Sequence, residues 1–87
     1  MIYNDKKIKE NLFVRIFNND IDEMELVWHR DRNTRIIKPL NENDWQLQID
    51  NELPFHLSMN KSYIIKKDVY HRLIKGTTIL KILIREI

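Results

Sequence analysis

The stretch Trp45-Gln46-Leu47-Gln48-Ile49-Asp50-Asn51 alternates apolar and polar side chains and then ends in two turn-forming residues. Successive side chains of a β-strand point to opposite faces, so Trp45, Leu47 and Ile49 share one face and the two glutamines share the other. A large aromatic residue in a small domain normally belongs to the core. This stretch therefore predicts a half-buried strand over residues 45–50 with its tryptophan inside.

Similar alternation recurs along the chain, for example at Leu80, Ile82 and Ile84. Clusters rich in Asn and Asp separate the alternating segments at short, fairly even intervals, and these residues mark turns because they tolerate left-handed backbone. Such spacing is typical of a sandwich or barrel of short strands. We predict an all-β fold with about eight strands, near residues 11–17, 24–31, 35–40, 45–50, 54–59, 62–67, 69–75 and 78–87. Residues 1–10 are expected to be a flexible lead-in, or to include a turn of helix over 5–10.

The composition is typical of one globular domain spanning residues 1–87, with 43% hydrophobic and 32% charged residues. The chain has no cysteine, which excludes a disulfide framework and a thiolate metal site. It has neither an apolar stretch long enough to span a bilayer nor the apolar region of a signal peptide. We therefore expect a cytoplasmic protein without a membrane partner. The lack of alanine and the abundance of Ile, Asn and Lys are typical of an AT-rich genome, such as that of a phage.

Several function classes are disfavoured by the sequence. The formal net charge of +2 is too small to indicate nucleic-acid binding by itself. An RNA-binding barrel would need one continuous basic patch made from Arg30, Arg32, Lys66, Lys67 and Arg72. The single glycine and the lack of a Ser or Thr nucleophile motif disfavour a phosphate-binding loop and a triad hydrolase.

Two similar segments lie far apart in the chain, Trp28-His29-Arg30-Asp31-Arg32 and Tyr70-His71-Arg72. Each places an aromatic residue, a histidine and an arginine in a row within a strand-like stretch. If the two strands are neighbours, the two imidazoles converge in one pocket. Residues two apart on a strand share a face, so Asp31 is expected to point the same way as His29.

These segments resemble the motifs of the cupin family, whose fold is a small double-stranded β-helix or jelly-roll barrel. The first cupin motif has Gly, five residues, His-x-His, three or four residues, Glu, six residues and Gly. With His29 on the first histidine of that motif, Asp31 takes the second, Arg35 takes the glutamate and Glu42 takes the closing glycine.

The second cupin motif has Gly, five residues, Pro-x-Gly, two residues and His. Its positions fall on Asn60, Lys66, Asp68 and His71. Both motifs fit in spacing without a gap, and the resemblance covers residues 24–75. The identities depart from the pattern, because only His29 and His71 of the usual four metal ligands are kept.

The resemblance implies a metal site made by His29, Asp31 and His71, since two imidazoles and one carboxylate suit Fe, Mn, Zn or Ni. Without a metal, Asp31 would orient a histidine that acts as general base. The third alternative is an ordinary polar cluster. Arg35 cannot donate a lone pair and would repel a cation, but a guanidinium in the pocket would suit a small carboxylate or phosphate ligand.

Gln48 is a further candidate ligand or substrate contact if its strand face lines the barrel. The alternative places Gln48 in solvent, with Trp45 and its neighbours in the core. His56 is isolated in the sequence and is expected at the surface or at a strand end.

The leading interpretation is a cupin-like protein that binds a divalent metal or a small anionic ligand in a barrel pocket, with catalysis left open. The alternative is a non-catalytic binding or regulatory module that acts through its surface on a protein or a nucleic acid. Segments 12–17 and 79–87 carry apolar residues on both faces, among them Phe13, Phe17, Ile79, Leu83 and Ile87. Such strands need cover on both sides, which predicts a homodimer formed through outer sheet faces or strand exchange.

Overall fold

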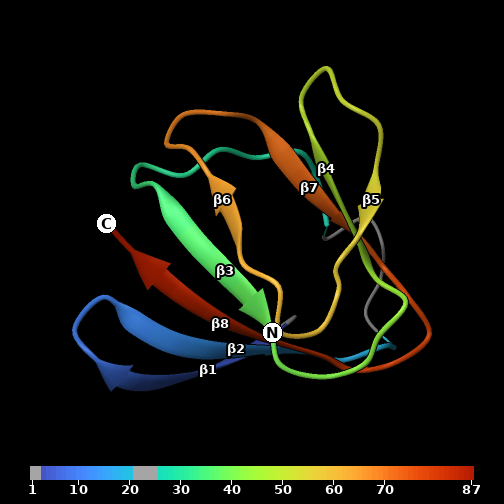
Figure 1. Cartoon of the computed structure of the whole chain (residues 1–87), viewed down its shortest axis with the longest axis horizontal. Coiled ribbons are helices and arrows are strands. Elements are labelled where there is room, and N and C mark those ends of the chain that lie inside the picture. The colour runs from blue at the N-terminus through green and yellow to red at the C-terminus, as the bar shows by residue number, and fades with distance from the viewer. Residues whose placement is uncertain (1–2, 21–25) are drawn as a thin grey trace.

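Eight β-strands and no helix form the described part of the computed structural model, which comprises residues 3–20 and 26–87. The strands are β1 (Tyr3–Lys9), β2 (Leu12–Phe17), β3 (Arg35–Pro39), β4 (Gln46–Ile49), β5 (Phe55–His56), β6 (Tyr63–Ile65), β7 (His71–Ile74) and β8 (Leu80–Glu86). They build one sheet in the order β1-β2-β8-β3-β6 and a second in the order β5-β4-β7, with antiparallel pairs throughout (Figure 1). The predicted all-β class is confirmed.

The core lies between the two sheets and is centred on β4 and on Trp45, which directly precedes it. Trp45 and Leu47 are 0% and 1% exposed, as the alternation predicts. The indole Nε1 of Trp45 donates a hydrogen bond of 2.6 Å to the carbonyl oxygen of Thr78, so its one polar atom is paired. From the opposite sheet, Leu80, Ile82 and Ile84 fill the same core.

Left-handed residues close several of the turns. Asn11, Asn51, Asn60 and Asp68 have φ between 64° and 66°, a conformation that Asn and Asp tolerate better than most residues. Three of these four positions fall in the predicted turn clusters. The fourth, Asn11, folds the N-terminal segment back along β2.

The segment that was predicted to be a lead-in or a helical turn is instead strand β1. It pairs with β2 from Tyr3 opposite Phe17 to Lys9 opposite Leu12, with an irregularity between Lys7 and Lys9. The prediction was wrong because it treated polar sequence as unpaired. An edge strand needs few apolar side chains, and lysines on such a strand discourage pairing with other chains.

The predicted strand at 24–31 is largely wrong in the part that the structure describes, and residues 24–25 lie outside it. Within 26–31 the structure has one isolated β-bridge, between His29 and His71. The backbone of Asp31 bonds elsewhere, because its carbonyl oxygen accepts a hydrogen bond of 2.8 Å from the Asp68 amide. The segment therefore crosses β7 at one point instead of running along it.

Strand β2 packs one of its faces against the core. Phe17 is buried and Phe13 packs against the core, whereas Val14 and its outward neighbours share the other face with Leu83 of β8. The homodimer that this two-sided strand suggests stays a prediction. None of the described residues belongs to a helix long and apolar enough to cross a membrane.

Gly76 is the position where we expect a single added methyl group to disturb the fold. A Cβ on Gly76 would overlap the Asp44 carboxylate and lie 2.8 Å from the Asp44 carbonyl carbon. That carboxylate accepts hydrogen bonds from the hydroxyl and the amide of Thr77, at 2.6 and 2.7 Å, and these bonds lower the pKa of Asp44.

The variant Gly76→Ala is expected to lose about 1–3 kcal/mol of unfolding free energy, the usual effect of overpacking. Urea denaturation followed by circular dichroism would measure the loss. Ser62→Ala at an exposed site is the control and should stay within about 0.5 kcal/mol of the parent chain. An unchanged midpoint for Gly76→Ala would contradict the close approach of residues 44 and 76.

Candidate metal centre

The two similar segments meet at one antiparallel bridge, between His29 and His71, and the repeat includes a valine before each aromatic residue. Val27-Trp28-His29-Arg30 lies against Val69-Tyr70-His71-Arg72. The His29 amide donates to the His71 carbonyl at 3.0 Å, and the His71 amide donates to the His29 carbonyl at 2.9 Å. The two imidazole rings lie 4.3 Å apart between centroids. The predicted convergence of the histidines is confirmed.

The flanking residues of these segments pack together on the opposite face. The guanidinium of Arg72 lies 5.0 Å from the centre of the Trp28 ring, and that of Arg30 lies 5.5 Å from the centre of the Tyr70 ring. Both contacts are in the range of cation–π attraction. Trp28 and Arg30 thus each contact a residue of the Tyr70-His71-Arg72 segment beside the bridge.

Hydrogen bonds to the backbone fix the same tautomer in both histidines. Nδ1 of His29 lies 2.9 Å from the carbonyl oxygen of Val27, and Nδ1 of His71 lies 2.9 Å from that of Val69. A carbonyl oxygen can only accept, so each Nδ1 carries the proton and donates it. Each Nε2 therefore keeps its lone pair, which is the arrangement that metal-binding histidines use.

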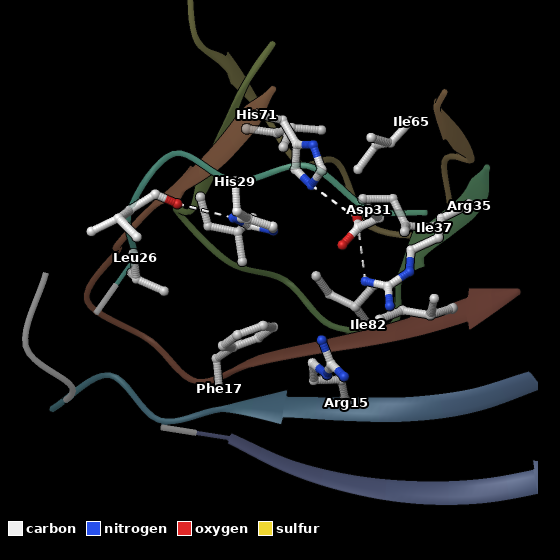
Figure 2. Close-up of a pocket in the computed structure, with 14 residues that line it drawn as sticks. Arg15, Phe17, Leu26, His29, Asp31, Arg35, Ile37, Ile65, His71 and Ile82 are labelled. Carbon is white, nitrogen blue, oxygen red and sulfur yellow. Dashed lines mark hydrogen bonds and ion pairs between the residues drawn. The ribbon is translucent and has the colours of Figure 1, made fainter. Parts of the chain in front are cut away.

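Asp31 brings a carboxylate to the same place. Its Oδ2 lies 3.3 Å from Nε2 of His71 and 3.4 Å from Nη1 of Arg35 (Figure 2). Ligand atoms from His29, Asp31 and His71 all lie within 4.8 Å of one another. In the part of the chain that the structure describes, Oδ2 is buried and accepts no hydrogen bond.

The geometry around His71 makes this arrangement suited to a cation. Burial lowers the pKa of His71, which is 4% exposed, whereas its hydrogen bond to the Val69 carbonyl and the charge of Asp31 act in the opposite direction. Two imidazoles and one carboxylate, with ligand atoms within 4.8 Å of one another, are a donor set that fits a metal ion.

Glu86 is a member of the site that the sequence reading missed. It stands opposite Arg35 in the pairing of β3 with β8. Its Oε2 lies 3.1 Å from Nε and 3.0 Å from Nη2 of Arg35. The signal was present in the sequence, because residue 86 continues the inward-facing row of residues 80, 82 and 84.

The site opens into a pocket of about 370 Å³. His29, Asp31, Arg35 and His71 form its polar end, and most of the other lining residues are apolar, among them Phe17, Leu26, Ile37, Leu47, Ile65, Leu73, Ile82 and Ile84. Figure 2 shows Arg15 of β2 on the wall opposite the histidines. Arg15, also unnoticed in the sequence, makes a bidentate ion pair with Asp5 at 2.7 and 2.9 Å.

Two other candidates lie elsewhere. Gln48 is not among the pocket-lining residues, because its Oε1 accepts from Arg72 at 2.9 Å and its Nε2 donates to the Glu52 carbonyl at 3.1 Å. Gln48 therefore follows the second alternative given above, in which its strand face points toward solvent and Trp45 lies in the core. His56 is exposed, with Nε2 at 2.5 Å from the Asn43 carbonyl oxygen.

Solved structures similar to this chain include a cupin-2 domain protein, an Fe(II)-bound protein and a chain from structures of two lyases. A cupin-2 domain protein from Shewanella frigidimarina matches with TM-score 0.65 and 15% identity, over 94% of this chain and 76% of that one. Fe(II) HppE matches with TM-score 0.72 and 14% identity, over 98% of this chain and 50% of that one. A chain from the structures of the DMSP lyases RdDddP and RnDddQII matches with TM-score 0.72 and 12% identity, over 86% of this chain and 36% of that one.

The likeness shows the fold. The chain thus spans about a third of the lyase chain and half of the HppE chain. No protein-family model and no curated protein matches the sequence. The predicted cupin-like jelly-roll fold is confirmed by these structures and by the arrangement of the eight strands in two antiparallel sheets.

Proposed function

We propose that this chain, which has the cupin fold, binds a divalent metal through Nε2 of His29, Nε2 of His71 and a carboxylate oxygen of Asp31. The observation that carries the proposal is the buried Oδ2 of Asp31, which has no hydrogen-bond partner among the described residues and lies 3.3 Å from Nε2 of His71. A metal ion bound here would give this oxygen a partner. The Fe(II) in the similar HppE structure supports the same inference.

The donor set restricts the choice of metal. Two imidazoles and a carboxylate suit Fe(II), Mn, Zn and Ni, and they leave coordination positions open. When bound, such an ion acts as a Lewis acid on any ligand that occupies an open position. The backbone bonds from Val27 and Val69 orient the two histidines for this role.

The second partner in the proposal is a small anionic ligand with an apolar body. The metal ligands and Arg35 gather at one end of the pocket, whereas aliphatic residues and Phe17 line most of the remainder. An anionic group would bind at the polar end, and the rest of the molecule would replace water against the apolar wall. The reaction, if one follows, is not determined by the fold.

Metal analysis of untagged protein tests the proposal directly. We expect about one metal ion per chain by elemental analysis and a higher melting temperature on adding Fe(II), Mn, Zn or Ni, because a ligand that binds only the folded state stabilises it. His71→Ala should lose the metal. His56→Ala removes an exposed histidine outside the pocket and is the matched control, which should keep it. No bound metal and no thermal shift with any of the four ions would refute the proposal.

A further inference from the structure

Arg35 and the proposed metal would use the same oxygen atom. Nη1 of Arg35 lies 3.4 Å from Oδ2 of Asp31, and that oxygen is also the one nearest to Nε2 of His71. Both the guanidinium and a metal ion are cations, so they compete for this carboxylate and repel each other. Taken alone, this contact makes Arg35 an obstacle to metal binding, which is one of the two roles that the sequence left open for it.

Glu86 offers Arg35 a second carboxylate and so reduces its competition with a metal ion for Asp31. Its Oε2 contacts two nitrogens of the same guanidinium, at 3.0 and 3.1 Å, which is closer than the contact between Arg35 and Asp31. The three side chains are all partly shielded from water, with exposures of 17% for Arg35, 16% for Asp31 and 24% for Glu86. One cation thus lies between two carboxylates, and the group keeps one net negative charge.

We infer that Glu86 is the positioning residue that allows a metal to bind beside Arg35. The guanidinium is an internal cation that shields Asp31, and an incoming metal displaces it from Asp31 onto Glu86. Glu86 contacts no proposed ligand atom, so it acts only through Arg35. This inference rests on the proposed metal function and adds a residue that controls the affinity of the site.

Two substitutions are expected to change metal affinity in opposite directions. Glu86→Gln keeps the shape of the side chain but leaves Arg35 with Asp31 as its charged partner in the pocket, which should weaken metal binding by about tenfold, as for other residues behind a metal ligand. Arg35→Gln removes the competing cation and should tighten metal binding by roughly tenfold. In the Arg35→Gln background, Glu86→Gln should have no further effect, because the charge that it balances is gone.

The experiment measures the dissociation constants of Zn and Mn by competition with a chromogenic chelator, for the wild-type chain, both single variants and the double variant. Glu52→Gln makes the same chemical change at an exposed site outside the pocket and should leave both constants unchanged. The coupling between positions 35 and 86 is the decisive readout. A residue with a merely structural role would weaken binding equally in both backgrounds.

This design distinguishes a failure of the proposed role of Glu86 from a failure of the proposed metal function. If the wild-type chain binds metal but Glu86→Gln binds it equally well, or is weakened to the same extent with and without Arg35, the role of Glu86 is refuted and the metal site stands. If neither the wild-type chain nor Arg35→Gln binds metal, the proposed metal function itself fails, and the role of Glu86 fails with it.

Discussion

The variant Asp31→Asn is expected to lose metal binding without losing stability. An amide oxygen is a far weaker ligand than a carboxylate for a divalent ion, and the variant also lacks the negative charge. We expect the affinity to fall by at least about a hundredfold, more than the ten- to hundredfold effect of residues behind the ligands. Competition with a chelator, as for Glu86, would measure the loss.

The stability of the metal-free variant should remain at the parent level or rise. The new amide can donate a hydrogen bond to Nε2 of His71, where the carboxylate presents a second acceptor at 3.3 Å. The ion pair that is lost joins Asp31 to Arg35 at 3.4 Å, and Arg35 keeps Glu86 as a partner. Thermal unfolding in a chelating buffer checks this, with Asp50→Asn at an exposed position as control. A variant that binds metal like the parent would remove Asp31 from the ligand set.

The largest loss of stability is expected from Trp45→Ala. Trp45 is fully buried, packs against Phe17 at 5.8 Å between ring centroids, and donates a hydrogen bond to the Thr78 carbonyl. Truncating a buried tryptophan leaves a cavity and costs about 3–5 kcal/mol. Since small domains have only about 5–15 kcal/mol of unfolding free energy, this substitution should remove a large share of the stability.

Trp28 provides the matched control in the same chain. It is 40% exposed and contacts the Arg72 guanidinium, an interaction worth about 0.5–1 kcal/mol at exposed sites. Urea denaturation of Trp45→Ala, Trp45→Phe and Trp28→Ala should therefore rank in that order, with the first least stable. Equal losses for the two alanine variants would mean that residue 45 is not the centre of the core.

The alternation around Trp45 and along β8 was enough to predict these two strands, because the period of two is a local property of a half-buried strand. The convergence of His29, Asp31 and His71 followed from spacing shared with the cupin motifs. Strand β1 could not be found in this way, since its pairing depends on the turn at Asn11 and on an edge position that tolerates lysine. The local sequence does not indicate which strand lies at the edge of a sheet.

The spacing along β8 places residue 86 on the inward face, but the role of Glu86 also depends on the pairing of β8 with the distant strand β3, which spacing does not give. From the sequence, Arg35 could be considered only as an isolated positive charge. The register of β3 with β8 shows that the carboxylate of Glu86 lies beside it. The orientation of Gln48 was likewise left open, because both faces of its strand are plausible until the core is known. The predicted homodimer, the cytoplasmic location and the phage origin stay predictions.

The single bridge between His29 and His71 has a consequence for how the chain resists proteases. Segment 26–31 makes only this one strand contact among the described residues, so it should open before the sheets do. A metal held on both sides of the bridge would tie this segment to β7 and close a long loop that contains β3, β4, β5 and β6. Bound metal would then be expected to slow the cutting of this loop by a protease.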